Sequence, residues 1–476
     1  MKPLTIDEIV KATGGYLRSG SADTRIQGVS TDSRGVLPCD LFFALRGDTF
    51  DGHAFLSDVI ARGCNAVVVS EANGEIVAGG ATSEDLVVIE VSDTLKAYQD
   101  LAAYYRKLIG ATVIAVTGSV GKTTLKEMIA CGCTGRYRIA YTQKNYNNQI
   151  GVPKTIFEMD EDTQVLILEL GLDRAGDIRR LAEIARPDIA AITNIGVSHR
   201  GNFDSDEGIF FAKMEIAEFL GSENVLIING DDEKLMRVKK ISKNAYRVLR
   251  AGMGVDCDFR LENLRHEHPR SAEDKTTGIA FRIAHGSESA EFSLNMPGLH
   301  GGIAAALAAA ALSEIKIGLQ AFSESLASYR PTARRLFIRE NGGVTILDDT
   351  YNASPDSMRS GLEALMSLNG KRKIAVLGAM NDLGADSPKM HRYVGKIVSQ
   401  LGVDVLVTVG EKAADIAKGA AEVGRCPICM HFDSPAAAAE ALEPMMLDGD
   451  VYFVKGSNAT KMNLVADALA EAERVL

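Results

Sequence analysis

The chain has 476 residues and a net charge of −11 at pH 7, with 46% hydrophobic and 24% charged residues. This length is too great for one hydrophobic core and predicts two to four globular domains. The acidic balance includes no basic block, which argues against a nucleic-acid-binding protein. No apolar run reaches the roughly 18 residues that span a bilayer, and seven cysteines form no disulfide framework in a chain of this size. We therefore expect a cytoplasmic protein without a signal peptide.

Residues 1–105 mix short apolar strands with glycine-rich turns and predict a small N-terminal α/β domain. A helical pattern at 93–109 closes this block. The predicted strands are LFFAL (41–45), NAVVVS (65–70) and DLVVIEV (85–91).

From residue 106, strands alternate with helical segments, which predicts mostly parallel sheets covered on both faces. Residues 106–329 form the predicted central domain, and the polar, alternating stretch 255–293 predicts an antiparallel insertion. Residues 330–476 repeat the strand–helix style and predict a smaller, Rossmann-like α/β domain. The predicted strands are TVIAVTG (112–118), QVLILELG (164–171), IAAITNI (189–195) and NVLIING (224–230), then TILDD (345–349), KIAVLG (373–378), DVLVTVG (404–410) and DVYFVKGS (450–457).

The segment VIAVTGSVGKTTLKEM (113–128) turns from a strand into a helix and predicts a phosphate-binding loop. The common pattern has an earlier glycine, at the position that Val116 occupies here. Glycines allow backbone N–H groups to approach phosphate oxygens at a helix N-terminus. Lys122 can reach the β- and γ-phosphates, and Thr123 offers a hydroxyl to Mg²⁺. The alternative is a structural glycine turn, but the strand–GxxGK[ST]T–helix order favours a nucleotide site.

Two further strand ends carry groups that suit a metal ion. Glu169 ends one predicted strand, and His199 lies just beyond the next. Open parallel sheets bind ligands at the carboxyl ends of their strands, so we expect both side chains near the loop. Either residue alone would more often be structural.

Seven motifs follow one another in an order that is typical of one enzyme family. The chain resembles the Mur ligases, which are ATP-dependent, amide-forming enzymes of peptidoglycan synthesis. An N-terminal stretch at 30–53 resembles a uridine-binding domain of that family, and the resemblance covers nearly the whole chain. The motifs are TGSVGKTT (117–124), NYNNQIGVP (145–153), ITNIGVSH (192–199), FAKMEIAE (211–218), LDDTYNASPDSM (347–358), VLGAMNDLG (376–384) and VKGS (454–457).

Within the family, the motif at 347–358 resembles that of the members that join D-alanyl-D-alanine to UDP-N-acetylmuramoyl-tripeptide, and the DNPR signature of the MurE type is missing. The resemblance implies that ATP phosphorylates a substrate carboxylate and that an amine attacks the acyl phosphate. Both steps gather negative charge, which metal ions and cationic side chains stabilise. It also implies two Mg²⁺ ions, with Thr123 and Glu169 at the first and His199 at the second.

The resemblance further implies that Lys213 carries a CO₂-derived carbamate and becomes an anionic metal ligand; without it, Lys213 reads as a solvated helix lysine. Arg335 is the implied γ-phosphate arginine, with Arg334 as the alternative in register. The implied catalytic residues are Lys122, Lys213, His199 and Arg335. The implied ATP-binding residues are Gly118, Ser119, Val120, Gly121, Lys122, Thr123, Thr124, Asn148, His300, Arg335 and Asp349. The implied substrate-binding residues are Ser30, Asp32, Ser33, Arg34, Arg46 and Asn352.

Some positions depart from the family pattern. In GLHGGIAA (298–305), His300 is kept but Gly301 and Ala304 replace two asparagines, and Asn458 replaces an arginine after KGS. Three alternatives remain: a related ligase such as MurE that adds a single amino acid, a folylpolyglutamate synthetase, or a nucleotide-binding module that has lost ligation. The N-terminal motif disfavours the folate enzyme, and the retained phosphate and metal residues disfavour loss. We expect a monomer with no nucleic-acid partner.

Overall fold

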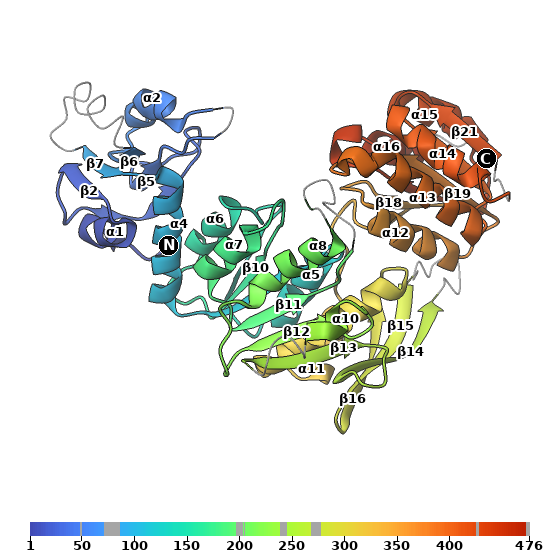
Figure 1. The fold of residues 1–476 in the computed structure, drawn as a ribbon, viewed down its shortest axis with the longest axis horizontal. Coiled ribbons are helices and arrows are strands. Elements are labelled where there is room, and N and C mark those ends of the chain that lie inside the picture. Colours follow the sequence, from blue (N-terminus) through green and yellow to red (C-terminus); the bar gives the residue numbers. More distant parts are fainter. Residues whose placement is uncertain are drawn as a thin grey trace.

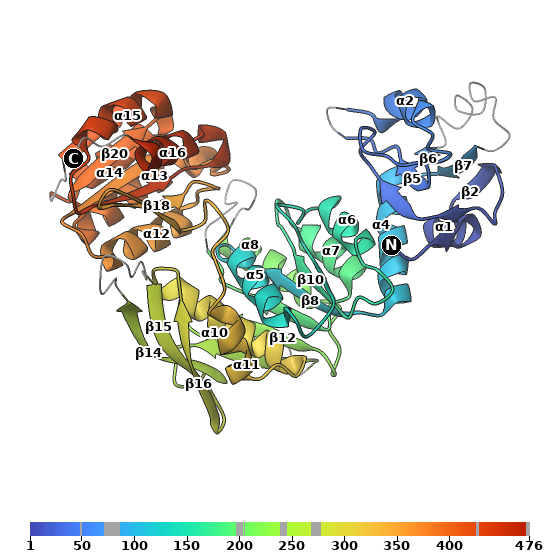
Figure 2. The same ribbon diagram turned by 180° about the vertical axis from the view of Figure 1, so that it is seen from behind.

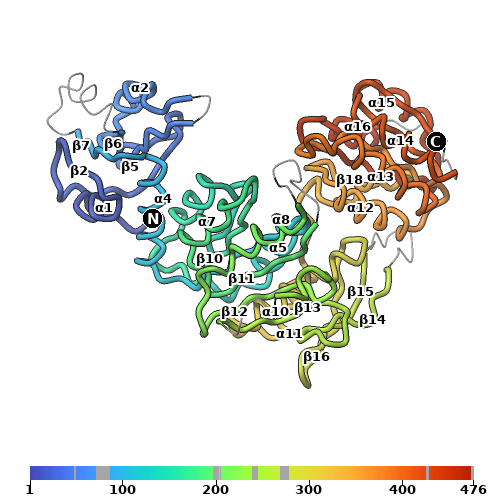
Figure 3. Tube along the Cα trace, in the orientation of Figure 1, coloured from blue at the N-terminus to red at the C-terminus, as the bar shows by residue number. Residues whose placement is uncertain are grey.

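The computed structural model describes residues 1–47, 50–70, 86–196, 203, 205–238, 245–267, 278–424 and 428–472. The chain forms three α/β units, with the central unit lying between the N-terminal and C-terminal units in an open V (Figures 1 and 2). The colours run in order along the molecule, so the chain passes once from unit to unit (Figure 3). The prediction of three α/β domains with mostly parallel sheets is confirmed. No helix in these described ranges has both the length and the hydrophobicity needed to cross a bilayer.

The N-terminal unit is built on a five-stranded sheet in the order β2-β7-β6-β5-β4, in which only β2 is antiparallel to its neighbour. Helix α1 begins with a capping box between Thr5 and Glu8, which explains why it starts where it does. The strands are β2 (Tyr16–Ser19), β4 (Gly28–Ser30), β5 (Asp40–Phe43), β6 (Ala66–Ser70) and β7 (Val87–Val91), with a separate pair of β1 (Leu4–Thr5) and β3 (Arg25–Ile26), and the helices are α1 (Ile6–Thr13) and α2 (Leu56–Ala61).

The central unit contains a nine-stranded sheet in the order β16-β15-β14-β13-β12-β11-β8-β10-β9. Pairing is parallel from β9 to β14, whereas the neighbouring pairs β14–β15 and β15–β16 are antiparallel. The antiparallel strands predicted at 255–293 are therefore present, and they extend the main sheet. The strands are β8 (Thr112–Thr117), β9 (Ile139–Tyr141), β10 (Val165–Glu169), β11 (Ile189–Ile192), β12 (Val225–Asn229), β13 (Arg247–Gly252), β14 (Phe259–Glu267), β15 (Gly278–His285) and β16 (Glu288–Leu294).

Helices cover both faces of this sheet because its strands are apolar on both sides. In β8, Val113 and Ala115 enter one core, while Ile114 and Val116 enter the other. The first core is covered by α6 (Gly151–Phe157), α7 (Asp177–Ala185) and α8 (Asp206–Met214), and the second by α5 (Lys122–Cys133), α10 (Leu299–Glu314) and α11 (Leu319–Leu326).

Helix α4 (Thr94–Ile109) joins the N-terminal and central units. It starts at the side-chain cap Asp93 and ends at Gly110, whose φ of 73° suits glycine. Its buried face belongs to a core that contains side chains from both units. The two units therefore share apolar packing along one helix.

The C-terminal unit has a six-stranded sheet in the order β17-β18-β22-β19-β20-β21, parallel except for β17. Two apolar cores lie on its two faces. Its strands are β17 (Phe337–Asn341), β18 (Val344–Asp349), β19 (Arg372–Gly378), β20 (Val405–Val409), β21 (Ile428–Phe432) and β22 (Asp450–Lys455), and its helices are α12 (Pro355–Ser367), α13 (Ser387–Leu401), α14 (Ala414–Ala421), α15 (Pro435–Leu442) and α16 (Asn463–Glu471).

The shared core gives a stability prediction for Tyr105 on α4. Its buried hydroxyl accepts from the Lys2 amide and donates to the Met159 carbonyl, both at 2.7 Å. Tyr105→Phe leaves that carbonyl without its partner, so the free energy of unfolding should fall by about 1–2 kcal/mol in urea. The control is Tyr104→Phe, which removes only a 3.2 Å contact with Glu8 at a partly exposed position. Equal stability of both variants would contradict the prediction.

Candidate active site

The short loop between β8 and α5 is held by the end of the neighbouring strand β11. The Ser119 amide donates to the Asn194 carbonyl (3.1 Å), and the Val120 amide donates to Asn194 Oδ1 (3.0 Å). Asn194 Nδ2 and Thr193 Oγ1 both donate to the Val120 carbonyl, at 3.0 and 2.6 Å. Residues 193–194 thus replace the support that a longer loop would provide for itself, and Val116 lies inside β8 rather than in the loop.

Two glycines of this loop are required by geometry. Gly118 has a φ of 145°, and a β-carbon there would lie 1.8 Å from the hydroxyl oxygen of Thr193. Gly121 has a φ of 84° and occupies the N-cap of α5, where no side chain caps the helix. The N–H groups of the first turn of α5 can therefore bind an anion, which the helix dipole also favours.

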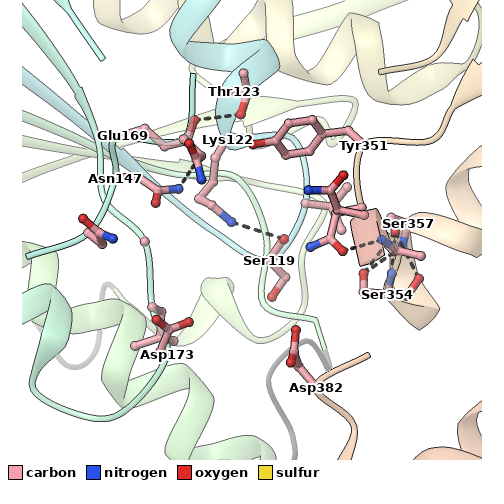
Figure 4. A pocket seen from close by; sticks show the side chains of 18 of the residues that line it. Ser119, Lys122, Thr123, Asn147, Glu169, Asp173, Tyr351, Ser354, Ser357 and Asp382 are labelled. Atoms are coloured by element: carbon pink, nitrogen blue, oxygen red, sulfur yellow. Dashed lines mark hydrogen bonds between the residues drawn. The ribbon is translucent and has the colours of Figure 1, made fainter. Parts of the chain in front are cut away.

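Glu169 and Thr123 meet beside the loop, as the sequence predicted. Thr123 Oγ1 donates to Glu169 Oε2 at 2.7 Å, and Asn147 Nδ2 donates to Glu169 Oε1 at 2.9 Å (Figure 4). A hydroxyl and a carboxylate at a strand end are the hard oxygen donors that Mg²⁺ prefers, so these residues fit the implied ion. Asn147 was missed in the sequence, although it lies in the motif at 145–153. The predicted Asn148 also lines the cleft, and its Oδ1 accepts from the Ile150 and Gly151 amides at the start of α6.

Two lysines lie in the site with lowered basicity. Lys122 Nζ donates to the Gly118 carbonyl at 2.8 Å, and burial lowers its pKa. Lys213 on α8 is only 1% exposed, so it is not a solvated helix lysine. Burial and the nearby charge of Lys122 hold the pKa of Lys213 well below its ordinary value, against the opposing effect of Asp356. His199 lies outside the described residues.

The C-terminal unit supplies a third buried lysine, which the sequence did not single out. Lys455 is 2% exposed, and its Nζ contacts Asp349 Oδ2 at 2.5 Å and the Asn352 carbonyl at 2.7 Å. Asp349 Oδ1 accepts from the Leu336 amide at 3.1 Å, so both carboxylate oxygens of this predicted ATP-binding residue are engaged within the protein. The motif VKGS contained Lys455, but a strand-end lysine alone carries no signal of its partner.

The structure distinguishes between the two arginines that the sequence left open. The guanidinium carbon of Arg335 lies 3.9 Å from the centroid of the Tyr351 ring, and Arg335 lines the cleft. Arg334 instead lies 3.6 Å from Asp467 on α16. Arg335 is therefore the arginine in position to meet a ligand.

A cleft of about 1310 Å³ brings these groups together between all three units. The predicted residues Ser30, Asp32, Ser33 and Arg34 are not part of its lining; Arg34 pairs with Asp32 at 2.8 Å, and the pKa of Asp32 falls to about 2 through hydrogen bonds from Arg34. The predicted residues that do line the cleft are Arg46, Ser119, Val120, Gly121, Lys122, Thr123, Thr124, Asn148, Glu169, His300, Arg335, Asp349 and Asn352.

On the side of the cleft near α10, Gly301 and Ala304 stand where the family pattern has two asparagines. Ala304 lines the cleft, whereas a β-carbon at Gly301 would lie 2.9 Å from the Leu294 side chain. An asparagine at 301 would therefore require Leu294 to move. His300, at the start of α10, faces the C-terminal unit and lies 3.6 Å from Glu363 on α12.

Comparisons with known proteins agree with this architecture. Family models match residues 25–106 (Mur ligase family, catalytic domain), 116–312 (Mur ligase middle domain) and 334–458 (Mur ligase, glutamate ligase domain). A relative from Bacillus subtilis is 33% identical over 98% of both chains. The crystal structure of MurF from Acinetobacter baumannii superposes with a TM-score of 0.88 at 28% identity over 99% of both chains. The MurF ligase from Thermotoga maritima in complex with ADP superposes with a TM-score of 0.81 at 25% identity, over 93% of this chain and 97% of that one.

The chain therefore belongs to the Mur ligase family, as the sequence motifs predicted. The Bacillus subtilis relative carries the name UDP-N-acetylmuramoyl-tripeptide--D-alanyl-D-alanine ligase.

The contact between Gly118 and Thr193 gives a prediction for the loop. Gly118→Ala forces a β-carbon into the Thr193 hydroxyl and a strained φ, so the loop must shift. We expect ATP-dependent phosphate release to fall about 100-fold, because a small displacement of phosphate-binding groups has large kinetic effects. Gly135→Ala is the matched control, since Gly135 has a φ of 74° with no atom within 4 Å of the added carbon. Equal activity of the two variants would contradict the role of the close contact.

Proposed function

We propose that this chain is an ATP-dependent ligase that joins D-alanyl-D-alanine to UDP-N-acetylmuramoyl-tripeptide in peptidoglycan precursor synthesis. The observation that carries the proposal is the match over 98% of both chains to a ligase of that name. The cleft supports it, because a phosphate-binding loop faces cationic groups of another unit across a space large enough for more than one substrate. In such a reaction the carboxylate must reach the γ-phosphate of ATP, and the amine must reach the acyl phosphate that forms.

In the proposed reaction, the tripeptide carboxylate attacks the γ-phosphorus of ATP, which forms an acyl phosphate and releases ADP. The amine of D-alanyl-D-alanine then attacks the acyl carbon, expels phosphate and loses a proton as the amide forms. The α5 N-terminus, Lys122 and Arg335 would orient the phosphates and offset the charge that develops on them. Neither step requires an oxidant or a reductant.

The proposal includes magnesium, which would neutralise phosphate charge when it is bound. Thr123 and Glu169 would hold the first ion, with Asn147 orienting the carboxylate. His199, outside the described residues, and Lys213 as a carbamate would serve the second. A carbamate forms when a neutral amine adds CO₂ and loses a proton, and the burial of Lys213 supports the neutral amine.

The two peptide substrates would meet different walls of the cleft. Arg46 of the N-terminal unit lines it and is held by Asp51 at 3.0 Å, which suits the anionic UDP-linked substrate. Ser30, Asp32, Ser33 and Arg34 would contact the uridine end outside the cleft lining. The C-terminal unit contributes Asn352 to the lining, and that wall would receive the dipeptide.

The proposed function is tested by measuring phosphate release with ATP and UDP-N-acetylmuramoyl-tripeptide, with and without D-alanyl-D-alanine. Release should depend on the dipeptide and yield the pentapeptide product. Lys122→Ala should abolish ligation with little change in stability, because it removes a cation that stabilises the transition state. Lys418→Ala, on an exposed lysine of α14, is the control. Dipeptide-independent release by the unaltered enzyme would refute the proposed acceptor, and full activity of Lys122→Ala would remove the phosphate role.

The carbamate at Lys213 predicts chemical rescue. Lys213→Ala should be nearly inactive, and short carboxylic acids should restore part of the activity by supplying an anion in the vacated space. Mass spectrometry in bicarbonate buffer should show the added mass of CO₂ at Lys213. A bare lysine in fully active enzyme would contradict this assignment.

A further inference from the structure

A buried histidine that takes no part in the proposed chemistry lies behind the C-terminal wall of the cleft. His391 on α13 is 0% exposed. Its Nε2 accepts from the Met380 amide at 3.0 Å, and its Nδ1 lies 2.7 Å from the Ser387 carbonyl. A backbone amide can only donate and a carbonyl can only accept, so these partners assign the neutral ring with its proton on Nδ1.

Met380 belongs to a loop, residues 379–383, that follows β19 and reaches the cleft. Asn381 and Asp382 of this loop line the cleft, and Figure 4 shows the Asp382 side chain there. Asp382 has a φ of 61°, in the left-handed region, which aspartate visits more often than most residues but which is less favourable than the ordinary regions. Contacts at the ends of the loop help to hold it in this conformation.

The loop has two polar anchors that differ in kind. On one side, the Asn381 amide donates to Ser457 Oγ at 2.8 Å, and the Ser457 amide donates to the Ala379 carbonyl at 2.9 Å. On the other side, His391 accepts from Met380. The serine contacts do not titrate, whereas the histidine contact exists only while Nε2 has a free lone pair.

We propose that His391 is a positioning residue for the acceptor substrate, because its neutral ring holds the 379–383 loop with Asn381 and Asp382 facing the cleft. The inference rests on the proposed function, in which the C-terminal wall receives a dipeptide with an ammonium and a carboxylate group. Asp382 offers a carboxylate to the ammonium group. Asn381 and Asn458 both line the same wall and offer amide N–H groups to the carboxylate.

The proposal has a definite pH sign. Burial lowers the pKa of His391, Asp415 on α14 raises it, and Lys412 lowers it; Arg392 beside it on α13 pairs with Asp415 at 3.5 Å. A ring with a lowered pKa is neutral at neutral pH, so the contact with Met380 is intact there. It is lost as the pH falls through that pKa, because the protonated ring has two N–H donors and no acceptor.

The test compares two substitutions of similar size at position 391. In His391→Gln, the amide oxygen can take the place of Nε2 and accept from Met380. In His391→Leu, the volume is filled but the Met380 amide is left unsatisfied. We expect the KM for D-alanyl-D-alanine to rise about tenfold or more in the Leu variant and to stay within about threefold in the Gln variant. The KM for ATP and kcat should change little, since the phosphate loop belongs to another unit.

The pH profile supplies a second readout, which begins with the unaltered enzyme. In the unaltered enzyme, the KM for the dipeptide should rise on acidification below the ordinary titration range of histidine, because the pKa of His391 is lowered. The Gln variant should lack this rise. His431→Gln, at an exposed histidine of β21 whose Nδ1 lies 2.9 Å from the hydroxyl of Thr408 on β20, should keep it.

Four results would overturn the proposal: an unchanged dipeptide KM in His391→Leu, equal increases in the KM for ATP and dipeptide, the same acid rise in the Gln variant as in the unaltered enzyme, or no acid rise in the unaltered enzyme. Thermal unfolding of each variant shows whether that variant has kept its fold. If a variant has not, the pH profile of the unaltered enzyme tests the proposal in its place, and the absence of the acid rise refutes it. The failure of this inference can be told apart from the failure of the proposed function. If the unaltered enzyme releases phosphate only with the dipeptide but the substitutions at His391 have no effect, only the role of His391 is refuted.

Discussion

The arrangement of the site depends on the hydrogen bonds between the phosphate loop and residues 193–194, which follow β11. Strands β8 and β11 are parallel neighbours in register, with Thr117 opposite Ile192, so the residues that follow them emerge side by side. Asn194 then accepts hydrogen bonds from the Ser119 and Val120 amides. The first turn of α5 is left as the anion-binding surface. Asp232, after β12, in turn accepts from the Ile195 amide at 2.7 Å. A loop too short to support itself is thus positioned by the order of three parallel strands.

These hydrogen bonds place the loop where cationic side chains from two units converge. Lys122 and Lys213 come from the central unit and Arg335 and Lys455 from the C-terminal unit, and their mutual repulsion lowers the pKa of the lysines beyond the effect of burial. Carboxylates also line the cleft and offset this charge, namely Glu169, Asp173, Asp177, Asp349 and Asp382. An anionic ligand that binds beside the cations would relieve the repulsion between them.

Much of the fold could be predicted because strand and helix periods are strong signals. The apolar runs of β8, β10, β11 and β12 and the helix at 93–109 appear where the sequence predicted them. The pairing of Thr123 with Glu169 also followed from strand ends that meet at one edge. What the sequence could not supply was the choice between adjacent residues. Asn147 rather than Asn148 contacts Glu169, because the turn before α6 directs Asn148 to backbone amides. Arg335 rather than Arg334 faces the cleft, because Arg334 is attracted to Asp467.

Contacts between residues that are far apart in the chain could not be predicted either. Lys455 and Asp349 are 106 positions apart and meet only because β18 and β22 pair in register. The glycine at 301, which the sequence marked only as a departure from its family, has a packing reason in Leu294. At the same helix end, Gly298 approaches Ala364 of α12 so closely that an added β-carbon would lie 3.3 Å away, and His300 lies near Glu363. Because the residues at the start of α10 are small, one turn of this helix both lines the cleft and contacts the C-terminal unit. Neither the hydrophobic period nor the motif spacing predicts this arrangement.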